Sequence, residues 1–371
     1  MDYTSLARTV FDVSVRLRSE HRVWIHCWDD SLELGSHLAE AARRRGSPVL
    51  LTVQPEEVWL RSILERSPRV LRVVPPHAAA ALGETDVYVF ALGPPTPIPW
   101  EEIPKERRRL VSVWLDTRYD RSTFAQRWAR LAKARRVRMI GIEATLATPK
   151  RAEALGIDFA TWRKVMFDGC AVDYRTVAKR AGSLASLLAR PGQVEISTPH
   201  GTSLRFALDR RPVQVSDGIA TEAKAAEGRV TYLPAGYVEV TANEDTPEGK
   251  VVFNLPIHSR AGRVEGLTLR FKKGRVTEFT ARKGERLFRS FLQEGTGDAD
   301  RFGFFGLGLN PSLKYGYTQD DKVLGGVTVG IGDNKSKGGR NRAGGEWWGC
   351  MTGATVKIGR RTIMVRGRLR G

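Results

Sequence analysis

Side chains that could do chemistry are scattered through this 371-residue sequence and form none of the familiar catalytic motifs. The sequence lacks a glycine-rich dinucleotide fingerprint, a phosphate-binding P-loop, the HExxH zinc motif and the GxSxG serine motif. Their absence disfavours nucleotide-binding and serine-hydrolase functions. Of the six histidines, only His200 and His258 lie in the second half, and isolated histidines are usually surface or packing residues.

The segment from His26 to Asp30 places a histidine, a cysteine and two aspartates at the end of the first predicted strand. Open α/β sheets bind ligands at the carboxyl ends of their strands, so a functional role is one interpretation. A structural role is the simpler one. Asp30 and Glu33 have the spacing of a capping box for the next helix, and we expect the other residues to pack in the core.

The sequence is strongly basic, with 60 Lys and Arg against 41 Asp and Glu and a formal net charge of +19. The last 37 residues hold ten basic residues and one acid. Such a charge attracts phosphates and favours RNA or a ribonucleoprotein such as the ribosome as a partner. The alternative is an arginine-rich, heat-adapted proteome with many ion pairs. The candidate polyanion-binding residues are Lys335, Lys337, Arg340, Arg342, Arg360, Arg361, Arg366, Arg368 and Arg370.

In the first half, the elements that position these residues alternate between apolar β-rich segments and helical ones. The alternation predicts an α/β domain over residues 1–190, including bridging helices, with an open, mostly parallel sheet and helices on both faces. Proline-rich residues 93–99 predict a stiff loop after a strand. Strands are expected at 22–28, 48–53, 86–93, 110–116 and 137–145, and helices at 32–45, 56–66, 122–136 and 158–188.

Beyond residue 190 the pattern changes to short alternating strands separated by glycines. Residues 191–371 are therefore predicted to form a mainly antiparallel, β-rich α+β domain, with residues 228–234 among its strands and a helix at 285–294. A hairpin turn is expected at 272–275, where Gly274 takes a positive φ. The last basic run alternates as a single strand does, which presents to solvent Arg361, Arg366, Arg368 and Arg370.

Five sequence blocks follow one another in the second half. They are GTSLRF (201–206), LPAGYVEV (233–240), FGFFGLGLNP (302–311), DDKVLGGVTVGIG (320–332) and GGRNRAGGEWW (338–348). The blocks resemble loops of the aminopeptidase T family of thermophilic metallo-aminopeptidases, and residues 147–174 resemble its bridging helix region. The resemblance implies an α/β domain, a β-rich domain of the thermophilic aminopeptidase type, a homodimer and an enclosed site with two divalent metals.

The metal ligands of that family are substituted at every position that can be matched. Two metal-binding glutamates, a histidine, a closing His-x-Asp pair and a tyrosine are replaced here, in that order, by Tyr237, Phe304, Thr328, Glu346 with Trp348, and Lys335. Two adjacent divalent ions need several carboxylate and imidazole donors to offset their dehydration. We therefore expect no metal, no other cofactor and no active metallo-aminopeptidase.

The acids that remain near the matched loops each have a structural explanation, such as a turn role for Asp320 and Asp321. Glu346 is expected to pair with an arginine such as Arg342, or to keep a polar role in a refilled cavity. The remaining acids are Glu244, Asp245, Asp320, Asp321, Asp333 and Glu346.

An aromatic cluster is expected to fill the space that the metals occupy in the family, because an emptied polar pocket must be repacked or hydrated. The alternative is a stacking platform for a base or an aromatic ligand. The members of the cluster are Tyr237, Phe304, Phe305, Trp347 and Trp348.

Two classes of function remain. The first is a catalytically diverged, metal-free binding protein for an anionic partner such as RNA or a ribonucleoprotein. The second is an enzyme: a metal-dependent aminopeptidase or other hydrolase with non-standard ligands, or a new activity in the old cavity. An iron-dependent ring-cleaving dioxygenase of the same fold also belongs to this class, but it would need His and Asp donors that the matched positions lack.

Localisation is expected to be cytoplasmic, with no membrane partner, because no apolar run is long enough to span a bilayer and the first residues lack the apolar core of a secretory signal. The three cysteines, Cys27, Cys170 and Cys350, are far apart and do not have zinc-site spacing. Neither a disulfide nor a structural zinc is expected.

Overall fold

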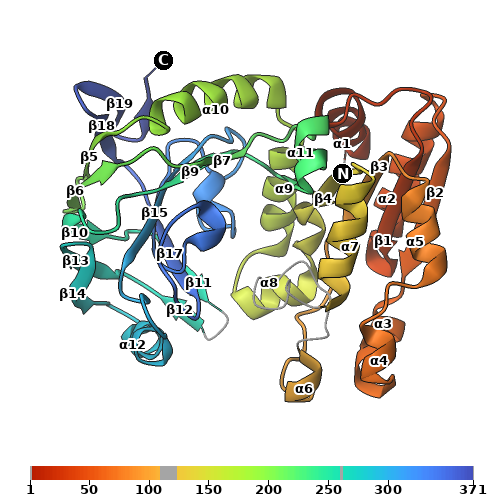
Figure 1. The fold of residues 1–371 in the computed structure, drawn as a ribbon, viewed down its shortest axis with the longest axis horizontal. Helices are drawn as coiled ribbons and strands as arrows, with labels where there is room; N and C mark the ends of the chain where they lie inside the picture. Colours follow the sequence, from red (N-terminus) through yellow and green to blue (C-terminus); the bar gives the residue numbers. More distant parts are fainter. Residues whose placement is uncertain (1, 109–122, 260–261, 371) are drawn as a thin grey trace. The chain divides into compact units, whose positions relative to one another are not determined.

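The computed structural model describes residues 2–108, 123–259 and 262–370 (Figure 1). The chain divides into two compact units, Met1–Arg175 with Gly218–Ala235 and Thr176–Asp217 with Gly236–Gly371. The chain therefore enters the second unit, returns once to the first, and then completes the second. In the part that the structure describes, no helix is long and apolar enough to cross a membrane.

A parallel sheet of five strands, in the order β2-β1-β3-β4-β8, forms the centre of the first unit. The predicted open parallel sheet is thus confirmed. Its β3 strand is buried along its whole length, as expected for a central strand with helices on both faces. The strands are β1 Val23–Trp28, β2 Val49–Gln54, β3 Val87–Ala91, β4 Arg138–Ile142 and β8 Val230–Leu233.

The β8 strand corrects one part of the sequence analysis, which places residues 228–234 with the antiparallel strands. This strand instead pairs in parallel with β4, with Val230 opposite Met139. Alternating burial along β8 is compatible with either sheet. The local pattern therefore indicated a strand correctly but could not indicate its partner.

Helices join the strands of the first unit. In α2, the apolar side chains of Leu34, Leu38 and Ala42 are four residues apart and are all buried, which is the spacing of one helix face. The predicted helix at 158–188 is divided into α9 and α10, and the strand predicted at 110–116 lies outside the described residues. The helices of the first unit are α1 Tyr3–Arg8, α2 Leu32–Arg43, α3 Glu56–Glu65, α4 Pro68–Leu71, α5 Pro76–Gly83, α6 Lys105–Arg108, α7 Thr123–Ala134, α8 Pro149–Leu155, α9 Phe159–Cys170 and α11 Glu222–Glu227; α10 Tyr174–Leu188 lies almost entirely in the second unit.

The capping box expected at Asp30 and Glu33 is wrong. Residues Asp29–Ser31 form a separate 3-10 turn, and α2 begins only at Leu32. Ser31 closes this turn, because its Oγ accepts from the backbone N–H of Trp28 and donates to the Trp28 carbonyl. The Asp30 carboxylate lies within the turn and makes no cap bond to α2 in the described structure.

Three antiparallel sheets form the second unit, which confirms the predicted β-rich fold. The eight-stranded sheet has the order β14-β13-β10-β6-β5-β18-β19-β20, and the five-stranded sheet has the order β17-β16-β15-β9-β7. The strands are β5 Gly192–Ser197, β6 Ser203–Leu208, β7 Val213–Ser216, β9 Tyr237–Thr241, β10 Glu248–Val252, β11 Ile257–Ser259, β12 Gly262–Val264, β13 Thr268–Lys272, β14 Arg275–Thr280, β15 Phe302–Gly308, β16 Val327–Gly332, β17 Glu346–Met351, β18 Thr355–Ile358, β19 Arg361–Val365 and β20 Arg368–Leu369, with α12 at Glu285–Glu294.

The two large sheets of the second unit pack against each other through aromatic side chains. Phe206 of β6 lies with its ring centroid 5.1 Å from that of Phe302 and 5.6 Å from that of Phe305, both on β15. Phe271 of β13 also contacts Phe302, at 5.5 Å. One face of the five-stranded sheet is therefore part of this core.

Two hairpin turns test the sequence analysis of this unit. The turn between β13 and β14 has Lys273 at φ 48° and Gly274 at φ 74°, so the predicted positive φ is confirmed. The sequence analysis predicts a single C-terminal strand, and this prediction is wrong. The run forms the hairpin β19–β20. It turns at Arg366 (φ 47°) and Gly367 (φ 77°), a pair of left-handed residues that suits a two-residue turn.

Candidate functional site

Five of the six substituted ligand positions lie on one face of the five-stranded sheet. Across β15, β16 and β17, Phe304 is opposite Gly330 and Gly330 is opposite Trp348. Residues opposite each other in register point their side chains to the same face. The same reasoning includes the other members of the set, which are Tyr237 opposite Gly308, Thr328 opposite Gly306, and Glu346 opposite Gly332.

Phe304 fills the centre of this face. Its side chain is 2% exposed, and its ring lies directly over Gly330, where an added Cβ would approach Cε1 to 2.1 Å. Only glycine leaves room for the phenyl ring at that position. The predicted filling of the site by an aromatic side chain therefore applies to Phe304.

Lys337 brings a positive charge to the same face. Its Nζ lies 4.6 Å from the ring centroid of Phe304, 3.3 Å from Glu239 and 3.2 Å from Glu346. The Lys337 side chain is 17% exposed and that of Glu239 13% exposed. We call these four residues the Lys337 cluster. It sets an ammonium between two carboxylates and against an aromatic face, an arrangement that stabilises a partly buried cation.

The pKa values in the Lys337 cluster follow from burial and charge. Burial alone would lower the pKa of Lys337, but the carboxylates of Glu239 and Glu346 outweigh it and hold this pKa above the ordinary lysine value. Burial raises the pKa of Glu239 to about 7; Lys337 opposes the rise and Glu346 adds to it. The ammonium is therefore charged at neutral pH, and Glu239 titrates in that region.

Two expectations about this face are corrected. Glu346 pairs with Lys337 and not with Arg342, because the short turn Lys335–Lys337 directs the lysine toward the sheet. The expected aromatic cluster is divided between the two faces. Phe305 packs into the core with Phe206, and Trp347 packs on Phe288 of α12 at 5.3 Å.

The remaining predicted residues of the pocket are near its margin. Trp348 is 37% exposed. Lys335, two residues before Lys337, is exposed on the turn. Sequence reasoning missed the part played by Glu239, although it lies two residues after Tyr237 and so shares its face of the strand. The pairing of Lys337 has no comparable signal, because it depends on the conformation of a loop.

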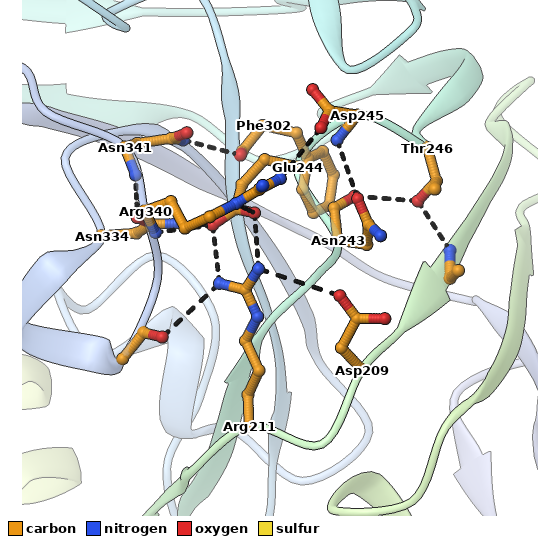
Figure 2. A network of polar contacts seen from close by, with 12 residues as sticks. Asp209, Arg211, Asn243, Glu244, Asp245, Thr246, Phe302, Asn334, Arg340 and Asn341 are labelled. Carbon is orange, nitrogen blue, oxygen red and sulfur yellow. Dashed lines mark hydrogen bonds and ion pairs between the residues drawn. The ribbon is translucent and has the colours of Figure 1, made fainter.

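A second polar cluster, the Glu244 network, joins the GGRN segment (338–341) of the fifth block to Glu244 and Asp245 (Figure 2). The Glu244 side chain is fully buried and accepts from both terminal nitrogens of Arg211 at 2.7 Å. It also accepts from the backbone N–H of Arg340 at 2.8 Å and from Asn334 Nδ2 at 3.1 Å. Burial raises the pKa of Glu244, but these hydrogen bonds outweigh it and bring the pKa down to about 2.

Asn334 and Asn341 connect this network to the strands. Asn334 donates to the Gly303 carbonyl at 2.9 Å and accepts from the backbone N–H of Asn341 at 2.8 Å. Asn341 Nδ2 donates to the Phe302 carbonyl at 2.9 Å (Figure 2). The network therefore holds the loop that carries Lys337 against the sheet.

Other acids near the site also have structural partners. Asp245 is paired with Arg340 at 2.9 Å and with Arg301. Asp320 accepts from the backbone N–H of Gly316 at 2.7 Å, which confirms a turn role, and Asp333 accepts from that of Ala343 at 3.5 Å.

The residues on this face do not fit a pair of divalent metals. Of the matched positions, only Glu346 offers a carboxylate, and the ammonium of Lys337 lies between it and Glu239. Within the described ranges, no three His, Cys, Asp or Glu side chains are grouped to share an ion. A lysine cation repels the metal that two carboxylates alone would attract.

The candidate polyanion-binding residues fall into two groups. Lys337 and Arg340 are engaged with carboxylates. The others are exposed, and for these the described structure has no ion pair: Lys335, Arg342, Arg360, Arg361, Arg366, Arg368 and Arg370. Five of the exposed group lie on or beside β19 and β20, at one edge of the eight-stranded sheet.

Comparison with known proteins gives one family match over part of the chain and two solved structures with a similar fold. The family model for thermophilic metalloproteases (M29) matches residues 159–314. No curated protein sequence matches. Wild-type AmpT from Thermus thermophilus has 18% sequence identity and a TM-score of 0.65, over 100% of this chain and 99% of that one. The 2,5-dihydroxypyridine dioxygenase from Pseudomonas putida KT2440 has 14% identity and a TM-score of 0.63, over 100% and 96%. At these identities, the two structures show a shared fold, and the resemblance to the aminopeptidase T family is confirmed.

Proposed function

Starting from the relationship of this chain to the M29 thermophilic metalloproteases, we propose that it is a catalytically diverged, metal-independent relative that binds an anionic macromolecule. RNA is the partner that its charge favours most directly. The cytoplasmic location and the homodimer implied by the resemblance are part of this proposal. Sedimentation of the purified chain at several concentrations tests the dimer.

The observation that carries the loss of metal chemistry is the position of the Lys337 ammonium. It lies between Glu239 and Glu346, on the face that holds the substituted ligand positions. A divalent ion there would have to displace this cation and would find few donors. The tethered ammonium offsets one of the two carboxylate charges, and Glu239 is partly protonated at neutral pH, so little negative charge remains to attract a metal.

The observation that supports polyanion binding is the basic edge at β19–β20, which we define as Arg360, Arg361, Arg366, Arg368 and Arg370. All five side chains are exposed, and none forms an ion pair in the described part of the chain. Elsewhere on the same sheet, charges alternate in register across the strands, with Lys357 opposite Glu195 and Glu195 opposite Arg205. The basic edge lacks such compensation and is therefore available to phosphates.

Binding of a single-stranded RNA, measured at several salt concentrations, tests this function. Replacing Arg366, Arg368 and Arg370 by Ala should weaken binding to any sequence and should reduce the slope of log affinity against log salt by about 2. The matched control replaces Lys272, Arg286 and Lys283, three exposed bases elsewhere in the second unit, and removes the same charge. Affinity that does not depend on salt, or an equal loss in both triple variants, contradicts a role of the basic edge.

The second candidate is a hydrolase that uses non-standard groups. It is favoured by Glu239, whose pKa of about 7 suits a general base at neutral pH. Its test is hydrolysis of an amino-acid anilide in the presence of added cobalt or zinc. Turnover that is lost in Glu239→Gln and kept in Lys335→Met would establish this candidate and refute the metal-independent binding protein.

A further inference from the structure

A cavity of about 740 Å³ opens in the first unit, at the carboxyl ends of its parallel strands. Its lining includes Asp29 and Asp30 after β1, Glu56 at the start of α3, Thr96 after β3, and Arg163 of α9. In the strand order β2-β1-β3-β4-β8, the chain reverses direction across the sheet between β1 and β3. Open α/β sheets bind ligands at this point, and the volume suits a small molecule.

The wall after β3 is held in place without a ligand. Arg151 Nη2 donates to the carbonyls of Pro94 at 2.8 Å and Thr96 at 2.9 Å, and Thr148 Oγ1 donates to that of Pro95 at 2.6 Å. Arg151 Nε also donates to the Pro94 carbonyl at 3.2 Å, so the loop predicted from its prolines is held by four hydrogen bonds from the region after β4. A cavity with a preformed wall costs little ordering free energy on binding.

The acids in the cavity differ in how they are used. Asp29 accepts from the backbone N–H of Glu56 at 3.2 Å, and Glu56 accepts from that of Thr96 at 3.1 Å. The side chain of Asp30 is exposed, and its carboxylate has neither a hydrogen bond nor an ion pair to another described residue. Burial, with Asp29 and Glu56 nearby, raises the pKa of Asp30 to about 6, and Arg163 opposes the rise. A cation bound beside Asp30 would lower this pKa.

Opposite charge lines the same cavity. The guanidinium of Arg163 lies 5.8 Å from the ring centroid of Phe159 and 5.9 Å from that of Phe167, and it donates to the Tyr3 hydroxyl at 3.1 Å. Across the described ranges it pairs with no carboxylate. The cavity therefore contains an acid and a base that both lack an ionic partner, with aromatic rings beside the base.

We propose that this cavity binds a small zwitterion with an apolar body, its ammonium on Asp30 and its carboxylate on Arg163. A charge-assisted hydrogen bond at each end gives orientation, and the rings of Phe159 and Phe167 provide apolar surface. Free amino acids with large apolar side chains belong to this class. The inference is independent of the proposed RNA binding, because every residue that it uses lies in the first unit.

Calorimetric titration of the full chain with L-phenylalanine and L-leucine tests the proposal. Phenethylamine and 3-phenylpropionate, each of which lacks one of the two charges, should bind at least about tenfold more weakly than L-phenylalanine. Asp30→Asn and Arg163→Met should each weaken amino-acid binding by about tenfold or more. Asp30→Asn breaks no bond of the fold, so this variant is expected to remain folded.

The matched control is Asp168→Asn, which removes an exposed acid of α9 that pairs with Lys164 and does not line the cavity. Its affinity for L-phenylalanine should equal that of the wild type. The proposal is overturned if neither amino acid binds to saturation, or if Asp30→Asn binds as tightly as the wild type. Equal affinity for phenethylamine and L-phenylalanine would also overturn it, because Arg163 would then have no role.

Discussion

Charged side chains are paired in the Lys337 cluster but unpaired in the cavity around Asp30. In the Lys337 cluster, the ammonium is 3.3 Å from Glu239 and 3.2 Å from Glu346, and Phe304 occupies the adjacent space. In the cavity, Asp30 and Arg163 line one space without pairing. Charges that lose water are stable only when they are paired, so the first region serves the fold; exposed Asp30 and half-buried Arg163 need no partner for stability and are suited to a ligand.

This difference shows that a shared fold does not by itself identify where a ligand binds. On the face that the resemblance marks as active, the charges are paired with one another, whereas unpaired charge is found in the cavity of the first unit and on the basic edge of β19–β20.

The largest effect is expected at the Glu244 network, whose charges are paired like those of the Lys337 cluster. Glu244→Ala leaves Arg211, 11% exposed, without its buried carboxylate. The free energy of unfolding should fall by about 3–5 kcal/mol, measured by urea denaturation. Glu244→Gln keeps an acceptor for Arg211 and should cost less. A loss below about 1 kcal/mol for Glu244→Ala would mean that the pairing of Glu244 with Arg211 contributes little to stability.

The next largest effect is expected for Lys337→Met, which leaves Glu239 and Glu346 without their shared cation. Unfolding should become easier by about 2 kcal/mol. The two carboxylates would then attract an added ion, so manganese or cobalt should raise the melting temperature of the variant. Lys335→Met, at the exposed lysine two residues before, is the control and should show neither change. If metal stabilises both variants equally, the effect does not arise from the cluster.

A smaller effect, up to about 1 kcal/mol for each pH unit, is expected in the pH dependence of stability. The pKa of Glu239 is raised from 4.5 to about 7 in the folded protein. Between these pH values the folded state binds more protons than the unfolded state, so the free energy of unfolding falls as pH rises. Glu239→Gln removes this contribution. Parallel pH profiles of the wild type and the variant would show that Glu239 has an ordinary pKa.

The smallest effect is expected for Asp30→Asn, whose carboxylate has no partner to lose. Its stability at neutral pH should stay within about 0.5 kcal/mol of the wild type, or rise slightly because Asp29 and Glu56 lose a like charge. Thermal unfolding of the two proteins measures this. A loss comparable to that of Lys337→Met would mean that Asp30 supports the fold, and the contrast between the two regions would disappear.

Periodicity in the sequence predicts most elements because apolar spacing reports burial directly. The apolar run at 22–28 corresponds to β1 at Val23–Trp28, and the helix expected at 32–45 corresponds to α2 at Leu32–Arg43. Partners in a sheet are not encoded locally, which is why β8 was placed with the wrong sheet. The turn at Arg366–Gly367 could have been predicted, because a glycine between two alternating segments readily takes the positive φ that a two-residue hairpin turn requires.

The candidate site was predictable only in part. The block order located Tyr237, Phe304, Thr328, Glu346 and Trp348, and strand alternation could have added Glu239. Lys337 looked like one more surface base, because its burial depends on Asn334 and Asn341, which fix the loop by hydrogen bonds to distant backbone. The cap role predicted for Asp30 is wrong for a different reason. A 3-10 turn before α2 removes it from the cap position.

Metal binding by the wild-type protein tests the central claim most directly. Purified protein is equilibrated with cobalt or zinc, dialysed, and analysed for metal per chain. Because the Lys337 ammonium already lies between Glu239 and Glu346 and repels a second cation, the wild type should retain no stoichiometric metal. Retention of two divalent ions per chain, lost on replacing Glu239 and Glu346 by glutamine, would contradict the claim that a lysine has taken the place of the metal.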